Sequence, residues 1–528
     1  MGTVTSQPEV KANFAVKTAG AKRSKAEAGG MNLGELLQGV DVVSTQVGAA
    51  APLVAETRVS AIAYDSRHVE AGGLFVAIRG EKMDGNRFVP AALEKGAAVI
   101  VSEDARPQEA GGPATWVQVG NARRALATIS ANFLGRPGEA LTLAGVTGTN
   151  GKTTTVFLLD SILRAAGHKT GLFGTIEYRT PLFVKTTANT TPESFDLQRF
   201  FADVRAEGGT HASFEVSSHA LAMDRVWGCH FAVAIFTNLT RDHLDFHKSF
   251  DHYFASKRRL FEGVGQGAPD VAVINADDGY GRQLIGLVPR TLTYGIESAA
   301  DLTAKKFALT FQGLEFAAKT PLGELQLKSP LVGRINVYNI LAAVGGAMAL
   351  GVDAEAIVRG IAALDAVPGR FQRIDEGQPF LVIVDYAHTD DALRNLIQTA
   401  RELTPNGRII TLFGCGGDRD RAKRPLMGEA AGSLSNRVVL TCDNPRTEDP
   451  LRIINDTVVG LQKVNADYMV EMDRERAIEI AMREAKAGDI VLLAGKGHET
   501  YQILKERTID FDDRLVARAT LRKLGFGK

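Results

Sequence analysis

A glycine-rich segment with one lysine and three threonines carries the strongest chemical signal in the sequence. It reads Gly148-Thr-Asn-Gly-Lys-Thr-Thr and joins the apolar run 141–146 to a helical pattern that starts at Lys152. Glycines let backbone N–H groups approach an anion at the positive end of a helix. Lys152 can then neutralise β- and γ-phosphates, and Thr153 can bind Mg²⁺. The segment predicts a nucleotide site, although Val146 stands where the full Walker pattern has glycine.

Two side chains after the next apolar runs could complete a metal site beside that segment. Glu215 ends the run Ala-Ser-Phe-Glu, and His243 lies in the stretch Thr237-Asn-Leu-Thr-Arg-Asp-His. Mg²⁺ prefers oxygen ligands such as carboxylates, and a histidine at a second strand end beside a phosphate loop favours a functional role. Taken alone, Glu215 could equally be a surface or capping residue.

Four apolar runs after residue 370 are each followed closely by polar or glycine-rich residues. In an open parallel sheet, ligands bind outside the carboxyl ends of the strands, so four such ends predict one shared crevice. The runs and the residues after them are 381–384 with Asp385-Tyr-Ala-His, 409–413 with Gly414-Cys-Gly-Gly-Asp-Arg, 438–440 with Asp443-Asn-Pro-Arg, and 490–493 with Gly495-Lys-Gly-His-Glu.

The elements that position these residues divide the chain into a tail and three α/β domains. The first 30 residues lack apolar periodicity and predict a flexible tail. Over 31–138, short apolar runs alternate with polar or helical stretches, which indicates a small α/β domain. We expect a larger α/β domain over 139–366 and a C-terminal one over 367–528, because Pro and Gly mark both boundaries. Apolar runs predict strands of the larger domain at 141–146, 212–216, 233–237 and 271–274.

Composition and charge exclude several classes of partner. The 528 residues are 45% hydrophobic, and Lys plus Arg equals Asp plus Glu at 61 each. Zero net charge gives no reason to expect nucleic acid or an anionic membrane as partner. No apolar run approaches the roughly 18 residues of a membrane span, and we find no signal-peptide core. Three widely spaced cysteines fit neither a disulfide framework nor a zinc site, so we expect reduced thiols in a cytoplasmic protein.

Six motifs occur in order along the chain, and together they resemble the Mur ligase family of ATP-dependent amide-forming enzymes. The resemblance covers nearly the whole chain after the tail. It implies a small N-terminal α/β domain, a central P-loop ATPase-like domain and a C-terminal Rossmann-like domain. The motifs are Gly145-Val-Thr-Gly-Thr-Asn-Gly-Lys-Thr-Thr, Glu215-Val-Ser-Ser-His, Thr237-Asn-Leu-Thr-Arg-Asp-His-Leu-Asp, Leu331-Val-Gly-Arg-Ile-Asn-Val-Tyr-Asn, Val367-Pro-Gly-Arg and Asp385-Tyr-Ala-His-Thr.

The resemblance implies a reaction of peptidoglycan precursor synthesis. The members most similar to this chain use ATP to phosphorylate the D-glutamyl γ-carboxylate of UDP-N-acetylmuramoyl-L-alanyl-D-glutamate. An amine of meso-2,6-diaminopimelate then attacks the acyl phosphate, and an amide forms. ATP and Mg²⁺ are the implied cofactors. The family match makes Lys152, Glu215, His243 and Lys257 catalytic, and makes Thr153, Glu215, His243 and Lys257 the metal ligands.

Lys257 is the residue whose implied role departs most from its sequence context. It matches the lysine that the family carbamylates with CO₂. An ammonium repels Mg²⁺, whereas a carbamate offers it an anionic oxygen. Judged only from the basic stretch Tyr253-Phe-Ala-Ser-Lys-Arg-Arg, it would be an exposed helical lysine.

The family match also assigns ligand contacts residue by residue. The implied ATP contacts are Gly148, Thr149, Asn150, Gly151, Lys152, Thr153, Thr154, Asn336, Asn339, Arg370, Asp385, Tyr386 and His388. The implied contacts to the UDP-muramoyl dipeptide are Ser66, Asn189, Thr190, Thr191, Ser217 and Arg225. The implied contacts to diaminopimelate are Arg419, Asp443, Asn444, Pro445, Arg446, Gly495 and Glu499.

Arg446 bears on the choice of amine substrate. Diaminopimelate differs from lysine by a carboxylate on its distal carbon, with which Arg446 can pair in bidentate fashion, and Glu499 suits the ammonium beside it. A surface arginine after a turn is the plain alternative. We expect small-molecule substrates only, with no nucleic acid, no membrane insertion and a monomeric state.

Rival functions differ in what they leave unexplained. The nearest rival is the same ligase acting on L-lysine, and a folate-type polyglutamate ligase is more remote. A P-loop kinase or GTPase would explain Lys152 and Thr153 but not the four polar strand ends after residue 370. A regulatory protein that binds ATP without ligation predicts missing metal and acceptor residues, and none is evidently missing from the sequence.

Overall fold

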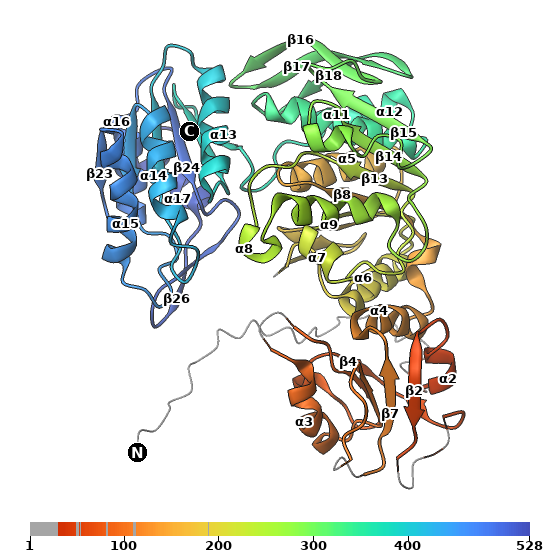
Figure 1. The fold of residues 1–528 in the computed structure, drawn as a ribbon. Coiled ribbons are helices and arrows are strands. Elements are labelled where there is room, and N and C mark those ends of the chain that lie inside the picture. The colour runs from red at the N-terminus through yellow and green to blue at the C-terminus, as the bar shows by residue number, and fades with distance from the viewer. Residues whose placement is uncertain are drawn as a thin grey trace, which may run out of the picture.

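Three α/β units follow one another along the chain, and each is built on its own sheet (Figure 1). The computed structural model describes residues 30–48, 52, 54–80, 83–108, 112–187 and 189–527. The predicted tail therefore lies outside the described residues, except for Gly30. The α/β class predicted from the sequence is confirmed.

The first unit is a five-stranded sheet between helices α3 and α4. Its order is β2-β7-β6-β5-β4, and only the β2–β7 pair is antiparallel. Successive residues of β6 point to opposite faces, so Val99 and Val101 pack beside α4 while Ile100 packs on the other face. The elements are β1 (Met31–Asn32), α2 (Leu33–Leu36), β2 (Val42–Gln46), β3 (Arg58–Val59), β4 (Ile62–Ala63), β5 (Leu74–Val76), α3 (Val89–Glu94), β6 (Val99–Ser102), β7 (Thr115–Val119) and α4 (Ala122–Phe133), with short 3-10 helices at Ser66–His68, Gly85–Phe88 and Pro137–Ala140.

The second unit is an eleven-stranded sheet with a parallel centre. Seven parallel strands in the order β9-β12-β8-β13-β14-β15-β16 are extended by antiparallel β10 and β11 at one end and β17 and β18 at the other. The four predicted central strands correspond to β8, β12, β13 and β14. The elements are β8 (Thr142–Thr147), α5 (Lys152–Ala165), β9 (Thr170–Phe173), β10 (Glu177–Arg179), β11 (Val184–Thr186), α6 (Ser194–Ala206), β12 (His211–Glu215), α7 (Ser218–Ala222), β13 (Val233–Phe236), α8 (Leu244–His247), α9 (Phe250–Glu262), β14 (Val271–Asn275), α10 (Gly279–Arg282), β15 (Thr291–Gly295), β16 (Leu302–Thr310), β17 (Gly313–Thr320), β18 (Gly323–Ser329), α11 (Ile335–Ala349) and α12 (Ala354–Ala362).

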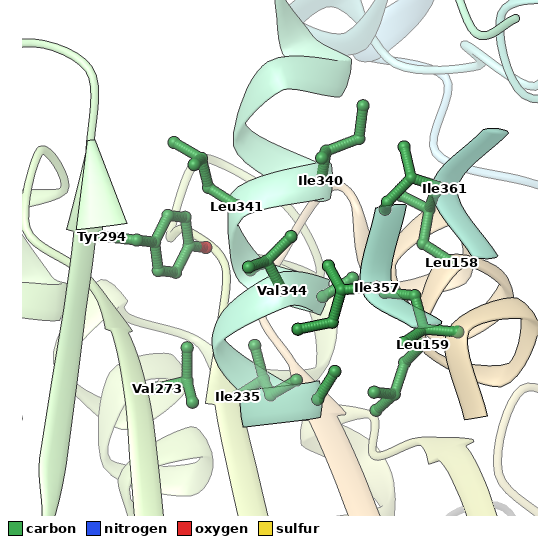
Figure 2. Close-up of a cluster of buried hydrophobic side chains, with 14 of the residues drawn as sticks. Leu158, Leu159, Ile235, Val273, Tyr294, Ile340, Leu341, Val344, Ile357 and Ile361 are labelled. Atoms are coloured by element: carbon green, nitrogen blue, oxygen red, sulfur yellow. The ribbon is translucent and has the colours of Figure 1, made fainter. Parts of the chain in front are cut away.

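Apolar packing under α5 fixes the helix that starts at the glycine-rich segment. Ile235 of β13 and Val273 of β14 point toward Val344 of α11, and Leu159 of α5 lies beside Ile357 of α12 (Figure 2). All five side chains are fully buried. Because burying such a side chain contributes about 1.5–3 kcal/mol, the position of α5 is strongly determined.

The third unit is a six-stranded sheet in the order β19-β20-β24-β21-β22-β23, parallel except for the β19–β20 pair. All four strands predicted after residue 370 are present, and they are immediate neighbours in this sheet. The elements are β19 (Gln372–Ile374), β20 (Leu381–Asp385), α13 (Asp390–Leu403), β21 (Ile409–Phe413), α14 (Lys423–Leu434), β22 (Arg437–Leu440), α15 (Pro450–Lys463), β23 (Tyr468–Val470), α16 (Arg474–Glu484), β24 (Ile490–Ala494), β25 (Tyr501–Ile503), β26 (Thr508–Asp510) and α17 (Asp513–Lys523).

Charged side chains join the first unit to the second. Tyr64 donates a hydrogen bond to Asp196 Oδ2 at 2.5 Å, and Arg123 pairs with Glu193 at 3.0 Å. Helix α4 also packs against α6, which places the first unit below the second in Figure 1.

The connection between the second and third units packs closely on the loop after β24. A Cβ added at Gly369 would lie 2.0 Å from His498 N, and Gly369 has φ +64°. Two residues on, Phe371 N donates to Asp385 Oδ2 at 2.6 Å. We propose domain boundaries near residues 138 and 366, because no sheet crosses either position.

Two further sequence expectations concern thiols and membranes. Cys229, Cys415 and Cys442 are free thiols, as expected. In the part of the chain that the structure describes, no helix has the length and apolarity that a bilayer crossing needs.

Candidate active site

The polar residues predicted beside the glycine-rich segment meet at one edge of the second sheet. The neighbouring parallel strands β9, β12, β8 and β13 end there. Thr175 follows β9, Glu215 ends β12, the loop 148–151 follows β8, and Thr237 follows β13. Because parallel strands all end at the same edge, residues far apart in the sequence become neighbours.

The segment after β13 supports the glycine-rich loop from behind. Asn238 O accepts a hydrogen bond from Thr149 N at 2.8 Å, and Asn238 Oδ1 accepts one from Asn150 N at 2.9 Å. Thr237 Oγ1 donates to Asn150 O at 2.6 Å. Those two loop N–H groups are therefore occupied. The first N–H groups of α5 and its cap, over residues 151–154, lack intrahelical acceptors and suit an anion.

Two glycines allow this loop to approach its neighbours. Gly148 has φ +144°, and a Cβ there would lie 1.9 Å from Thr237 Oγ1. Gly151 has φ +86°, and its Cβ would lie 2.4 Å from Asn339 Oδ1. Asn339 of α11 is buried and lies against the loop, and it donates to Asn336 Oδ1 at 2.8 Å.

Two lysine side chains converge on one carbonyl oxygen beside the loop. Lys152 Nζ lies 3.0 Å and Lys257 Nζ lies 2.7 Å from Gly148 O. Lys257 is only 1% exposed, so the alternative interpretation as an exposed helical lysine is wrong. Burial, together with repulsion from Lys152, holds the pKa of Lys257 well below its ordinary value. Burial also lowers the pKa of Lys152. A polyanion beside both groups would relieve their repulsion.

Glu215 is buried at the end of β12 and contacts the hydroxyl predicted to bind the metal. Thr153 Oγ1 donates to Glu215 Oε1 at 2.9 Å, and Thr175 N donates to the same oxygen at 2.8 Å. With 1% exposure, Glu215 is not a surface residue. A carboxylate and a hydroxyl in contact form an oxygen donor pair of the kind that Mg²⁺ prefers.

His243 lies on a left-handed turn after β13, with φ +51°. Its Nε2 is 3.4 Å from Asp242 Oδ2, and its ring centroid is 4.7 Å from that of His219. Partial burial lowers the pKa of His243 to about 4, against the opposing effect of Asp242. Within the described ranges, no group of three or more His, Cys, Asp or Glu side chains could hold a metal ion. A magnesium site here would therefore also need hydroxyl or lysine-derived ligands.

Four predicted ATP residues gather at the connection to the third unit. The Arg370 guanidinium lies 4.8 Å from the centroid of the Tyr386 ring, which is 4.6 Å from that of His388. Arg370 lines a cavity of about 270 Å³, and its Nε has no hydrogen-bond acceptor in the described structure. Both oxygens of Asp385 accept backbone N–H groups, so this carboxylate holds the connection in its present shape.

The residues predicted to bind the muramoyl peptide form a connected polar group. Thr191 Oγ1 donates to Glu215 O at 2.8 Å and accepts from Ser217 N at 3.1 Å. Arg225 donates to Thr191 O at 2.9 Å and pairs with Glu193 at 3.0 Å.

Three other predicted precursor residues have different surroundings. Thr190 Oγ1 lies 3.0 Å from Thr175 Oγ1, and Asn189 is exposed. Ser66 belongs to the first unit, where it begins the 3-10 helix after β4. A ligand that reaches from Ser66 to Thr190 would therefore span two units.

The guanidinium predicted to select the amine substrate is held by backbone oxygens. Arg446 Nη1 donates to Gly417 O at 2.8 Å and lies 3.4 Å from Asn444 O. Arg446 itself has φ +53°. These contacts use one guanidinium nitrogen, and a bidentate carboxylate uses two. Arg419 is exposed, and its Nη1 donates to Asp418 O at 3.1 Å.

The other predicted residues of this pocket lie at the ends of β22 and β24. Asn444 Nδ2 donates to Glu499 Oε2 at 2.8 Å. A Cβ added at Gly495 would lie 3.2 Å from Asp443 Oδ2. Because glycine has no side chain, the segment after β24 can lie close to Asp443. Pro445 is buried between Asn444 and Arg446 and restrains the turn.

Sequence analysis missed several residues that support these sites. Lys496 lies within the Gly495-Lys-Gly-His-Glu segment, so its place could have been noticed, whereas Thr175 follows a strand whose short apolar run gave little signal. The missed residues are Thr175, Asn238, Tyr253, Arg424 and Lys496. The Tyr253 hydroxyl lies 3.1 Å from Thr149 Oγ1, Arg424 pairs with Glu448 at 2.8 Å, and Lys496 pairs with Glu499 at 3.1 Å.

Family models match all three units of the chain. The model described as the Mur ligase family catalytic domain matches residues 58–134. The Mur ligase middle domain matches residues 146–347, and the glutamate ligase domain of Mur ligases matches residues 369–497.

Individual proteins resemble the chain over nearly its whole length. The UDP-N-acetylmuramoyl-L-alanyl-D-glutamate–2,6-diaminopimelate ligase of Solibacter usitatus is 55% identical over 94% of this chain and 99% of its own. A solved structure with the same ligase name has a TM-score of 0.66 and 32% identity, and the match covers 94% of this chain and 99% of that chain. The MurF ligase of Thermotoga maritima in complex with ADP shares the fold, with a TM-score of 0.58 and 19% identity over 89% of this chain and 97% of that chain.

Gly148→Ala should abolish tight binding of a nucleoside triphosphate. The added Cβ would overlap Thr237 Oγ1 at 1.9 Å and force the loop from its left-handed backbone. We expect at least a tenfold weaker affinity for a non-hydrolysable ATP analogue in isothermal titration calorimetry. Gly279→Ala is the matched control, because the nearest atom to its Cβ would be Arg282 Nη2 at 3.8 Å. Equal affinity in the Gly148 variant would contradict a phosphate role for this loop.

Proposed function

The chain belongs to the Mur ligase family, and we propose that it joins meso-2,6-diaminopimelate to the D-glutamyl γ-carboxylate of UDP-N-acetylmuramoyl-L-alanyl-D-glutamate at the expense of ATP. The 55% identity to a ligase of that name over almost the full length supports the proposal. The observation that carries the choice of amine is Arg446, held by Gly417 O at the end of a strand beside Glu499 and Asn444.

The first chemical step brings together two anions. An oxygen of the substrate γ-carboxylate attacks the γ-phosphorus of ATP, the bond to the β-phosphate oxygen breaks, and ADP leaves an acyl phosphate behind. Lys152 and the free N–H groups at the start of α5 stabilise the phosphate charge. In the second step a neutral amine attacks the acyl carbon, phosphate leaves, and the nitrogen loses a proton.

The residues around Glu215 fit a magnesium ion. When bound, Mg²⁺ neutralises phosphate charge and holds the reacting oxygens in place. The Thr153 hydroxyl and the Glu215 carboxylate, 2.9 Å apart, would bind it on one side of the loop. His243 would serve as a second-site ligand, for which the neutral form favoured by its lowered pKa is suitable.

Lys257 is proposed to carry a CO₂-derived carbamate. Only the neutral amine adds CO₂, and the lowered pKa of this buried lysine favours that form. The modification would place an anion instead of a cation beside Lys152. It would so remove the repulsion between the two lysine side chains that approach Gly148 O.

Diaminopimelate fits the third-unit pocket better than L-lysine. Lysine offers no carboxylate to the guanidinium nitrogens of Arg446 that Gly417 O does not hold, and a site built for a polar group can reject an analogue that lacks it by about 10⁴–10⁵. The Arg446 backbone contacts orient the guanidinium before substrate arrives, which reduces the entropy lost on binding.

The cytoplasmic location and monomeric state predicted from the sequence belong to the same proposal. Three free thiols suit a reducing compartment. The expected substrates are all small molecules.

The direct test is product formation by the purified protein. With ATP, Mg²⁺ and UDP-muramoyl dipeptide, we expect mass spectrometry to detect the UDP-tripeptide with diaminopimelate and little or none with L-lysine. ADP and phosphate should appear in equal amounts. No tripeptide with any diamine would refute the ligase assignment.

Arg446→Ala should remove both activity and selectivity. Truncating one partner of a hydrogen-bonded charge pair costs about 2–5 kcal/mol, so we expect kcat/KM for diaminopimelate to fall by about 30- to 4,000-fold. The preference over L-lysine should fall with it. Arg452→Ala is the control, because Arg452 is an exposed arginine of the adjacent helix α15. Unchanged selectivity in the Arg446 variant would contradict its contact with the distal carboxylate.

Lys257→Ala should lose most activity and a carbamate signal. Wild-type protein in ¹³C-bicarbonate is expected to give a carbamate resonance by NMR that the variant lacks. A short carboxylic acid should restore part of the variant's activity by replacing the anion. Lys328→Ala provides the control, since Lys328 is an exposed lysine of the same unit. Full activity in the Lys257 variant would dismiss the carbamate role.

A further inference from the structure

Lys496 is a buried cation in the amine pocket to which neither the sequence analysis nor the proposed reaction gives a role. It lies two residues after the end of β24 and has no solvent exposure. Its Nζ lies 3.1 Å from Glu499 Oε2 and 3.6 Å from Asp443 Oδ1. Because an unpaired buried ammonium is strongly unfavourable, these two carboxylates are what make this position possible.

The same ammonium is linked to the Asn444 side chain. Glu499 Oε2 accepts from both Lys496 Nζ and Asn444 Nδ2, the latter at 2.8 Å. Asn444 Oδ1 accepts from Ile503 N at 2.9 Å and lies 3.4 Å from Lys496 Nζ. Lys496 therefore fixes the carboxylate that Asn444 contacts, and the network assigns the orientation of the Asn444 amide.

The charges in this group leave one negative charge for a ligand. Asp443 and Glu499 bring two negative charges, and Lys496 cancels one of them. The charge of Arg446 is assigned to the distal carboxylate of the substrate, and Arg419 is exposed to solvent. Arg474 lies behind the strand ends and donates to Ala494 O at 3.0 Å, but its charge is matched by Asp513 at 2.7 Å. Asp443 Oδ1 is buried and has no hydrogen-bond donor among the described residues. One remaining negative charge matches one substrate ammonium.

We propose that Lys496 is a positioning residue that sets selectivity for the distal ammonium of the amine substrate, by holding Glu499 and Asn444 in place and limiting the negative charge of the pocket. This inference rests on the proposed function. Lys496 itself does not contact the reacting atoms. Without it, two carboxylates would face each other unneutralised, and Glu499 would no longer be held beside Asn444.

The test is a double-mutant cycle on the KM for diaminopimelate, with Lys496→Met, Glu499→Gln and the double variant in the full-length enzyme. Hydrogen bonds to charged groups contribute about 1.5–3 kcal/mol, so we expect Lys496→Met alone to raise this KM by about 10- to 100-fold. In the Glu499→Gln background the same change should raise it by less than about threefold, because the carboxylate that Lys496 positions is gone.

Three measurements separate positioning from general damage to the fold. The KM values for ATP and UDP-muramoyl dipeptide should change by less than about twofold in Lys496→Met. Lys496→Gln, which keeps a hydrogen-bond donor and removes the charge, should fall between wild type and Lys496→Met. Lys463→Met should behave as wild type, because Lys463 pairs with Glu429 on the exposed surface of the same unit.

The outcomes distinguish this inference from the proposed function. Equal losses in both backgrounds, or parallel increases in all three KM values, would overturn the positioning role of Lys496 while leaving the ligase activity in place. An unchanged KM for diaminopimelate in both Lys496 variants would do the same. A wild-type enzyme that forms no product with diaminopimelate would overturn both.

Discussion

The convergence of two lysine side chains on the carbonyl oxygen of Gly148 is the constraint on which the second unit depends. Lys152 and Lys257 lie 3.0 and 2.7 Å from that oxygen in a buried setting. Lys152 also donates to Thr149 O at 2.7 Å, so two carbonyl dipoles face two buried amines. Burial lowers the pKa of both lysines, and Lys152 lowers that of Lys257 further, so the site favours anions. The loop glycines, the buried Glu215 and the packing under α5 all hold this concentration of charge in place.

In the third unit, by contrast, the buried charged side chains are paired with one another. Arg424 pairs with Glu448, Arg474 with Asp513, and Lys496 with Glu499. These pairs fix the loops after β21, β22 and β24, which leaves Arg446 and Asp443 with unused polar atoms. Buried pairs add little net stability, but they determine which loop geometry is allowed.

The connection between the second and third units contacts residues of both predicted sites, the ATP site and the diaminopimelate pocket. Gly369 lies against the backbone of Gly497 and His498, in the loop that carries Lys496 and Glu499. Arg370, the next residue, lies over Tyr386, and both are among the predicted ATP residues. The predicted ATP residues and the loop after β24 are therefore packed together at Gly369, where a side chain has no room.

Apolar runs and the residues after them were enough to predict eight parallel-sheet strands, the helix at Lys152 and the four strand ends of the third unit. The sequence did not reveal β16 to β18, because strands with one exposed face alternate polar and apolar residues and resemble polar segments. Residue type and order also identified the family, and they supplied the site residues, whose roles stay predictions. Only the tertiary structure determined which lysines are buried. The local sequence indicates an exposed Lys257 in a basic helix and a loop position for Lys496, but segments distant in the sequence bury both side chains. Pairing across strand ends depends on sheet order, which is not local in sequence, so the contact of Thr175 with Glu215 and the partners of Lys496 emerged only from the fold.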